Sequence, residues 1–142
     1  MNATPTLTPV DGLITVTAGY TPTTHIHDID SIYSRQYWVP EIGPLSYLTL
    51  LFLASWMPAD EMTITIDYDE FARSLGTTAA RLTRTVQRLV GFHLAYIPVT
   101  DSSNLQIRRR LPTLNDRQLA RLTQRCPTLA ACHHDEQLHT AA

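Results

Sequence analysis

The chain has 142 residues, of which 44% are hydrophobic and 17% charged, which fits one globular domain with a buried core and excludes a disordered polypeptide. No basic N-terminal region precedes an apolar run, and the most apolar run, residues 45–57, is too short to span a bilayer. The sequence therefore predicts a cytoplasmic protein, nucleoid-associated if it binds DNA, with no membrane partner.

Charge is divided unevenly along the chain. Residues 1–72 carry one arginine and nine acids, which gives −8, whereas residues 73–125 carry ten arginines and two acids, which gives +8. All eleven basic residues are arginine. Such asymmetry favours a surface that binds a polyanion. The alternative is that the acidic half of the chain pairs with the basic half.

The N-terminal third begins with a segment rich in Thr and Pro. Residues 1–27 are predicted to form an arm, partly disordered or adding a strand, because only LITVT at 13–17 alternates like a strand. A short helix is expected next, with Asp28 or Asp30 as its N-cap and its end before Pro40. Its expected apolar stripe comprises Ile29, Ile32, Tyr33 and Tyr37.

Residues 44–57 are predicted to form a central helix that is apolar almost all round. Pro44 suits the first helical turn and Pro58 ends the helix. The expected inward stripe comprises Leu45, Leu48, Leu51, Phe52 and Trp56, widened by Leu50 and Leu53. Residues 62–67 alternate and are β-branched, so a short strand is expected there.

Two helical patterns separated by a turn occupy residues 67–90. Asp67 and Glu70 have the spacing of a capping box, and Gly76 suits the left-handed position beyond the first helix. Either Thr77 or Thr78 can cap the second helix. In the second helix, helical spacing puts apolar and cationic residues on opposite faces. The inward set is Leu82, Val86 and Leu89 with Val90, and the outward set is Arg81, Arg84, Thr85 and Arg88.

Residues 94–111 are predicted to form two strands joined by a turn at residues 101–104, with the first strand at a sheet edge because it contains Pro98. Alternation along the second strand puts Leu105, Ile107 and Leu111 on one face and Gln106, Arg108 and Arg110 on the other. Arg109 falls on the core side, so it is expected past the last paired residue or beside an acid.

The C-terminal part is predicted to contain a helix capped by Asn115 or Asp116, with an inner stripe of Leu119, Leu122 and Cys126. A last short helix is expected from Pro127, with a frayed tail after about His134. The predicted organisation is thus an arm at 1–27, one main domain at 28–125, and a C-terminal helix and tail at 126–142.

The order helix, strand, helix, turn, helix, hairpin is that of a winged helix-turn-helix. The stretch FARSLGTTAARLTRTVQRLV resembles the helix-turn-helix of bacterial regulators of the MarR and GntR kinds. GP at 43–44, RLVGFHLA at 88–95 and LPTLNDRQLARL at 111–122 also resemble a group of small winged-helix proteins of high-GC actinobacteria. This resemblance implies a mainly α fold with a small β-hairpin, an α+β winged helix-turn-helix at 67–90 with its wing at 94–111.

In such proteins the second helix of the motif enters the major groove of DNA. The resemblance implies that Arg81 reads bases, because a guanidinium can donate two hydrogen bonds to guanine, while Arg84 and Arg88 straddle base edges and phosphates. Arg108 and Arg110 are expected at a phosphate or in the minor groove. The full set of predicted DNA-binding residues is Thr77, Thr78, Arg81, Arg84, Thr85, Arg88, Arg108 and Arg110.

These patterns predict a sequence-specific DNA-binding protein, a transcriptional regulator that acts on double-stranded DNA as a homodimer. The arm and the helices at 115–134 are the expected dimerising parts. Tyr33, Tyr37 and Trp38 are either interface aromatics or core residues. The alternative hypotheses are a protein-interaction module, whose arginine face docks an acidic or transcription-related protein while LITVT augments another sheet, and a plasmid or phage replication accessory protein.

Neither catalysis nor a cofactor is predicted. No phosphate-binding glycine loop or nucleophile motif is present, and helix capping explains the acids at 67–70. The histidines and the pair Cys126 and Cys132 supply enough donor atoms for zinc, but their spacing is not that of a zinc site, and Cys126 suits a core position. The sequence therefore predicts no metal.

Overall fold

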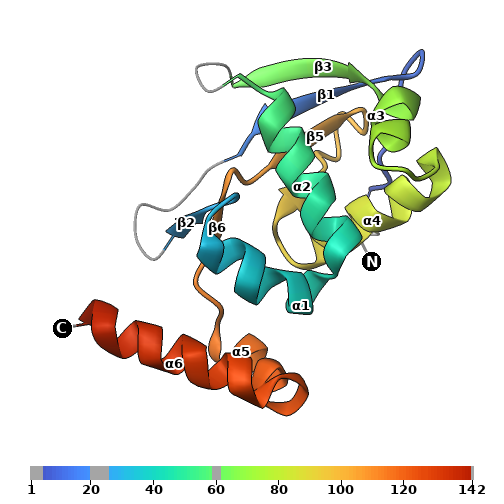
Figure 1. Cartoon of the computed structure of the whole chain (residues 1–142). Helices are drawn as coiled ribbons and strands as arrows, with labels where there is room; N and C mark the ends of the chain where they lie inside the picture. The colour runs from blue at the N-terminus through green and yellow to red at the C-terminus, as the bar shows by residue number, and fades with distance from the viewer. Residues whose placement is uncertain (1–4, 20–25, 59–61, 142) are drawn as a thin grey trace.

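The computed structural model describes residues 5–19, 26–58 and 62–141, with side chains up to residue 137, and the described chain has an α+β fold. Figure 1 shows a sheet at the top, α2, α3 and α4 below it, and a hairpin of α5 and α6 at the bottom. The elements in chain order are β1 (Leu13–Ala18), β2 (Ile26–Asp28), the π-helical segment η1 (Ser34–Trp38), α1 (Val39–Ile42), α2 (Pro44–Trp56), β3 (Thr63–Asp67), α3 (Tyr68–Ser74), α4 (Ala79–Gly91), β4 (Ala95–Tyr96), β5 (Asn104–Ile107), β6 (Arg110–Pro112), α5 (Asp116–Arg125) and α6 (Pro127–Ala141).

The strand β1 lies inside the main sheet, whose order is β3-β1-β5-β4. It pairs antiparallel with β3, with Ile14 opposite Ile66, and parallel with β5, with Val16 opposite Leu105. Ile14 and Val16 are buried in the core. The predicted strand is confirmed, and its pairing on both edges agrees with the strand-adding alternative for residues 1–27.

The helical region before α2 differs from its prediction. Pro40 does not end the helix: it lies in the first turn of α1, where its missing N–H costs no hydrogen bond. Tyr37 and Trp38 are 0% and 1% exposed, so they belong to the core and are not interface aromatics in this chain. Ile32, placed in the apolar stripe by its spacing, is 69% exposed.

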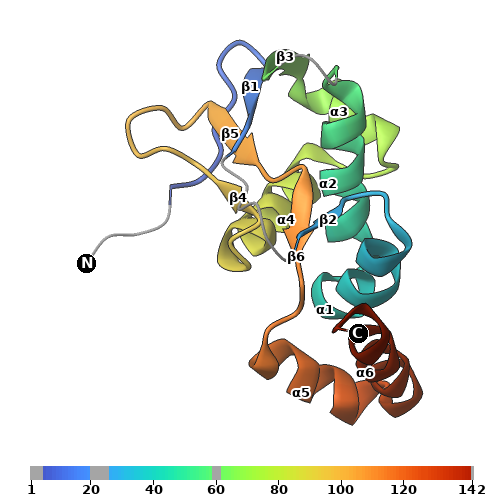
Figure 2. The same cartoon turned by 90° about the vertical axis from the view of Figure 1, so that its left-hand side faces the viewer.

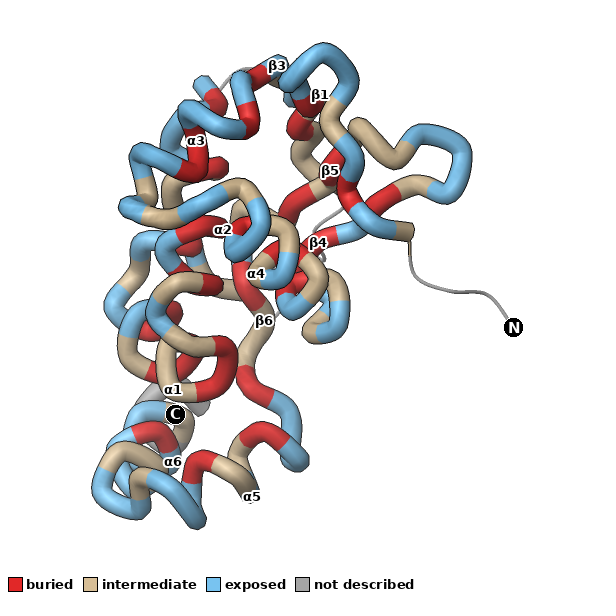
Figure 3. Tube along the Cα trace, turned by 90° about the vertical axis from the view of Figure 1, so that its right-hand side faces the viewer, coloured by how far each residue is buried: buried red, intermediate tan, exposed pale blue. Residues whose placement is uncertain are grey.

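The central helix α2 has the predicted bounds but turns a different face inward. Tyr47, Leu50 and Leu53 are buried, whereas Leu48 and Trp56 from the predicted stripe are 40% and 37% exposed. The physical reason is that a helix apolar on every side has no preferred face, so neighbouring elements decide its rotation. Figure 3 shows the buried residues concentrated between α2, α4 and the sheet.

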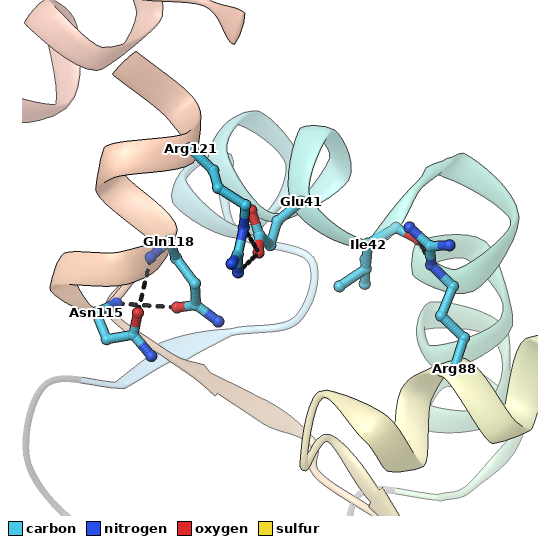
Figure 4. Close-up of polar contacts among 6 residues, drawn as sticks. All are labelled: Glu41, Ile42, Arg88, Asn115, Gln118 and Arg121. Carbon is cyan, nitrogen blue, oxygen red and sulfur yellow. Dashed lines mark hydrogen bonds and ion pairs between the residues drawn. The ribbon is translucent and has the colours of Figure 1, made fainter. Parts of the chain in front are cut away.

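The C-terminal helices form a hairpin held against α1. Asn115 caps α5 through a complete capping box with Gln118 (Figure 4). Arg121 donates from Nε to Oε1 of Glu41 at 3.0 Å, with Nη2 bonded to the same oxygen, and Glu41 is 6% exposed. The expectation of a frayed tail after His134 is corrected, since α6 continues to Ala141.

Candidate nucleic-acid interface

The turn between α3 and α4 is built by local capping. Asp67 accepts a hydrogen bond from the backbone N–H of Glu70 at 2.9 Å and so starts α3. At the other end, Gly76 has φ +71° and its N–H bonds to the carbonyl of Arg73, while the N–H of Thr77 bonds to the carbonyl of Ala72 at 3.0 Å. This pair of bonds is a Schellman motif, which ends the helix and turns the chain. Four residues, 75–78, then separate the two helices.

Replacing Gly76 with alanine is expected to lower the free energy of unfolding by about 1–2 kcal/mol, because an L side chain is strained in the left-handed region. The cost is conformational, since no atom lies within 4 Å of the added Cβ. Gly91→Ala is the matched control: its Cβ is equally free of contacts and its φ lies outside the left-handed region. Equal urea midpoints for the two variants would contradict this account of the turn.

The recognition candidate α4 has one buried and one exposed face. Thr78 caps it by accepting a hydrogen bond from the N–H of Arg81 at 3.3 Å. Leu82, Val86 and Leu89 are buried, as predicted. Arg81 and Arg84 are exposed, and neither forms an ion pair with any described residue. The alternative that the acidic half neutralises these two arginines therefore receives no support from the described part of the chain.

Arg88 is exposed but forms a hydrogen bond that joins α4 to α1. Its Nε donates to the carbonyl of Ile42 at the end of α1, at 2.9 Å, and its guanidinium lies 5.7 Å from the centre of the Phe92 ring. Figure 4 shows this contact beside the Arg121–Glu41 pair. Two consecutive residues of α1 therefore contact two helices: Glu41 binds Arg121 of α5, and Ile42 binds Arg88 of α4. Arg88 thus fixes α4 on α1, which removes it from the set of unengaged arginines.

The three threonines of the predicted site differ in whether their hydroxyl groups are free to contact DNA. Thr85 donates its hydroxyl to the carbonyl of Arg81 at 3.0 Å, and Thr78 is occupied as a cap but exposed. The hydroxyl oxygen of Thr77 is buried and has no partner among the described residues. Thr77 is therefore corrected from a DNA contact to a residue of the turn interior.

The hairpin predicted as a wing is smaller and less basic than expected. β4 and β5 pair through Ala95 and Ile107, and β4 is an edge strand, as Pro98 required. The connecting loop at 97–103 contains Asp101 and no basic residue. The segment before β1 forms a hydrogen bond with this loop: the backbone N–H of Thr8 donates to the carbonyl of Ser102 at 2.8 Å. In the same segment, the carbonyl of Pro5 accepts a bond from Gln87 of α4 at 3.0 Å.

The arginines after β5 are separated by the structure. Arg108 is half-buried at the base of the hairpin, and its N–H donates to Leu94 O. Arg110 lies in β6, which pairs with β2 in a second sheet (Figure 2). Its Nε is 3.2 Å from Oδ1 of Asp28. The predicted wing at 94–111 is corrected accordingly, because β6 belongs to a different sheet. Arg109 lies between β5 and β6, and its Nη2 donates to Pro58 O at 3.0 Å.

Two histidines hold distant segments together. His133 of α6 lies with Nε2 2.7 Å from the Tyr33 hydroxyl, and the ring of His27 stacks on Tyr33 at 3.7 Å. His25 and the side chain of His139, which belong to the donor set considered for zinc, lie outside the described residues. Among the side chains that are described, no group of three His, Cys, Asp or Glu could hold a metal ion. Periodicity gave no signal for this cluster, since its members are up to 106 positions apart in the chain.

Comparisons with known proteins assign the chain to no family. The chain matches no protein-family model, no curated protein and no solved structure. None of the helices in the described ranges is long and apolar enough to cross a membrane.

Proposed function

We propose that this chain binds double-stranded DNA through the exposed face of α4, as a transcriptional regulator of winged helix-turn-helix type. The order α2, β3, α3, α4, β4, β5 is that of a winged-helix domain. The observation that carries the proposal is the pair Arg81 and Arg84, which project from α4 opposite its buried residues and have no acidic partner among the described residues. Arginine on an exposed helix of this motif suits guanine edges and phosphates.

The proposed DNA-binding site of a single chain has few arginines. Arg88 keeps its charge but is held by the carbonyl of Ile42, and Arg110 pairs with Asp28, so Arg81 and Arg84 are the arginines most available to DNA, with Arg108 at the base of the hairpin. Proteins that bind DNA tightly make about 6–10 phosphate contacts. A homodimer on two half-sites is therefore part of the proposal, because it doubles the number of arginines that reach the duplex.

Measuring DNA affinity against salt concentration tests the proposal. Arg81→Ala and Arg84→Ala are each expected to weaken binding by about tenfold to a hundredfold, the range for one lost arginine contact to a base. Arg81→Ala should also relax the sequence preference selected from random oligonucleotides. Arg35→Ala is the matched control, because it removes the same charge from an exposed position on η1, outside the proposed DNA-binding and dimerising elements, and should leave affinity unchanged.

The opposing outcomes are well separated. If the wild-type chain binds no DNA at low salt, or if Arg35→Ala weakens binding as much as Arg81→Ala, α4 is not the DNA-binding element. In one alternative the same arginines dock an acidic protein, and the loop at 97–103, which has no basic residue, adds no cationic contact for either kind of partner. Addition of β1 to the sheet of a partner is no longer part of that alternative, since β3 and β5 occupy both edges of β1.

A further inference from the structure

A cavity of about 420 Å³ opens between α2 and the second sheet, away from the residues proposed to bind DNA. Figure 1 shows β2 and β6 beside α2, the elements that form its walls. Its volume falls in the range of small-molecule sites. The lining residues are Asp28, Ile29, Asp30, Leu51, Ala54, Ser55, Met57, Arg109 and Arg110.

The cavity has an apolar floor and a charged rim. Leu51 and Ala54 come from α2, and Ile29 and Met57 beside them are buried in the core. The rim carries Asp28, Asp30, Arg109 and Arg110. An apolar body can therefore be buried while one polar head group remains at the rim, which is the usual division in sites for small amphiphilic molecules.

The rim presents both signs of charge, and Arg110 keeps hydrogen-bond donors that no described residue uses. The Asp28 side chain is 68% exposed and the Arg110 side chain 56%, and Asp30 is also exposed while Arg109 is half-buried. Among the described residues, Arg110 is engaged only through Nε, which contacts Asp28 at 3.2 Å. Its two terminal nitrogens have no hydrogen-bond partner among the described residues, and such a pair of guanidinium nitrogens can bind a carboxylate bidentately.

We propose that this cavity binds a small carboxylic acid with an apolar body. The carboxylate pairs with the terminal nitrogens of Arg110, and the body lies on Leu51, Ala54 and Met57. The ligand can displace Asp28 from Arg110, because exposed ion pairs of this kind contribute little to stability. Asp28 competes with the ligand for the same guanidinium.

Calorimetric titration of the full chain with octanoate tests the site. Octanoate is expected to bind, whereas octylamine, with the same body and the opposite charge, and acetate, with the head alone, are not. Arg110→Gln should weaken octanoate binding at least tenfold, and Asp28→Asn should strengthen it by removing the competing carboxylate. Ala54→Leu should abolish binding by filling the floor, and Arg125→Gln, at an exposed position on α5, is the matched control.

The proposal is overturned if octanoate does not bind, if octylamine binds as tightly, or if Arg110→Gln binds octanoate like the wild type. Failure of Ala54→Leu to fold leaves the test intact, because Arg110 and Asp28 are exposed and their substitutions spare the core. The readout does not involve DNA, so a negative result here says nothing about α4.

Discussion

Replacing Trp38 with alanine is expected to lower the free energy of unfolding by about 3–5 kcal/mol, the range for truncating a buried large aromatic side chain. Trp38 is 1% exposed, and its indole N–H donates to the carbonyl of Pro112 at 2.8 Å. The variant therefore loses buried apolar area and also leaves a carbonyl of β6 without its donor. Urea unfolding followed by far-UV circular dichroism measures the change.

Trp38→Phe separates the two contributions. It keeps much of the apolar area, removes the indole donor and leaves a smaller cavity than alanine does, so it should cost less than Trp38→Ala, about 1–3 kcal/mol. An interface role for Trp38 predicts a different pattern. In that case Trp38→Ala would leave the unfolding midpoint of the monomer unchanged and alter the molecular mass in solution, and the core assignment made from its burial would be wrong.

Removing the hydroxyl of Tyr33 is the second large expected effect. This oxygen accepts a hydrogen bond from the N–H of Leu114 at 3.0 Å and lies 2.7 Å from Nε2 of His133. Tyr33→Phe leaves both buried groups without this partner, which is expected to cost about 1–3 kcal/mol. The loss should be greatest for the α5–α6 hairpin, because Leu114 precedes α5 and His133 belongs to α6. Tyr96→Phe removes a hydroxyl from a side chain that is 55% exposed and is the matched control.

The same cluster makes stability depend on pH. Burial lowers the pKa of His133 below its ordinary value of 6.5; the nearby carboxylate of Glu136 opposes this effect and His134 adds to it. Because Tyr33 Oη already accepts the N–H of Leu114, it is suited to donate its proton to Nε2, which requires a neutral imidazole.

The lowered pKa of His133 determines the direction in which stability changes with pH. The folded state binds fewer protons than the unfolded state, so its full stability is present above about pH 6.5 and declines as the pH falls below that value. His133→Gln should flatten this dependence when unfolding midpoints are compared between neutral and mildly acidic buffers. Should the variant retain the wild-type slope, another group is responsible for it.

Helix ends and faces with a strong periodic signal could be predicted from the sequence. Asp67, Gly76, Thr78 and Asn115 take the capping positions expected of them, because capping depends on residues within one helical turn. The two faces of α4 were also predictable, since its apolar and cationic residues alternate with the helical period. Three arginines of this helix, Arg81, Arg84 and Arg88, are exposed as predicted, and Arg81 and Arg84 form no ion pair with a described residue.

The tertiary structure decided which of the predicted DNA-binding residues are engaged in contacts within the fold. Arg88 and Arg110 have the same exposed pattern in sequence as Arg81, yet Ile42 and Asp28 engage them across the fold. Thr77 was predicted from its place in the turn, but packing buries its hydroxyl. These contacts join residues up to 82 positions apart, a range over which local periodicity carries no information.

By itself, the sequence determined the α+β class, the bounds of α2 and α4, and the cationic face of α4, because each depends on propensity and spacing within a single element. Only the tertiary structure placed β1 between β3 and β5, rotated α2, and assembled the cluster of His27, Tyr33 and His133. Strand order, the rotation of a helix that is apolar on all sides, and polar contacts between distant segments depend on which surfaces meet when the chain packs, and that is settled by the burial of the whole core.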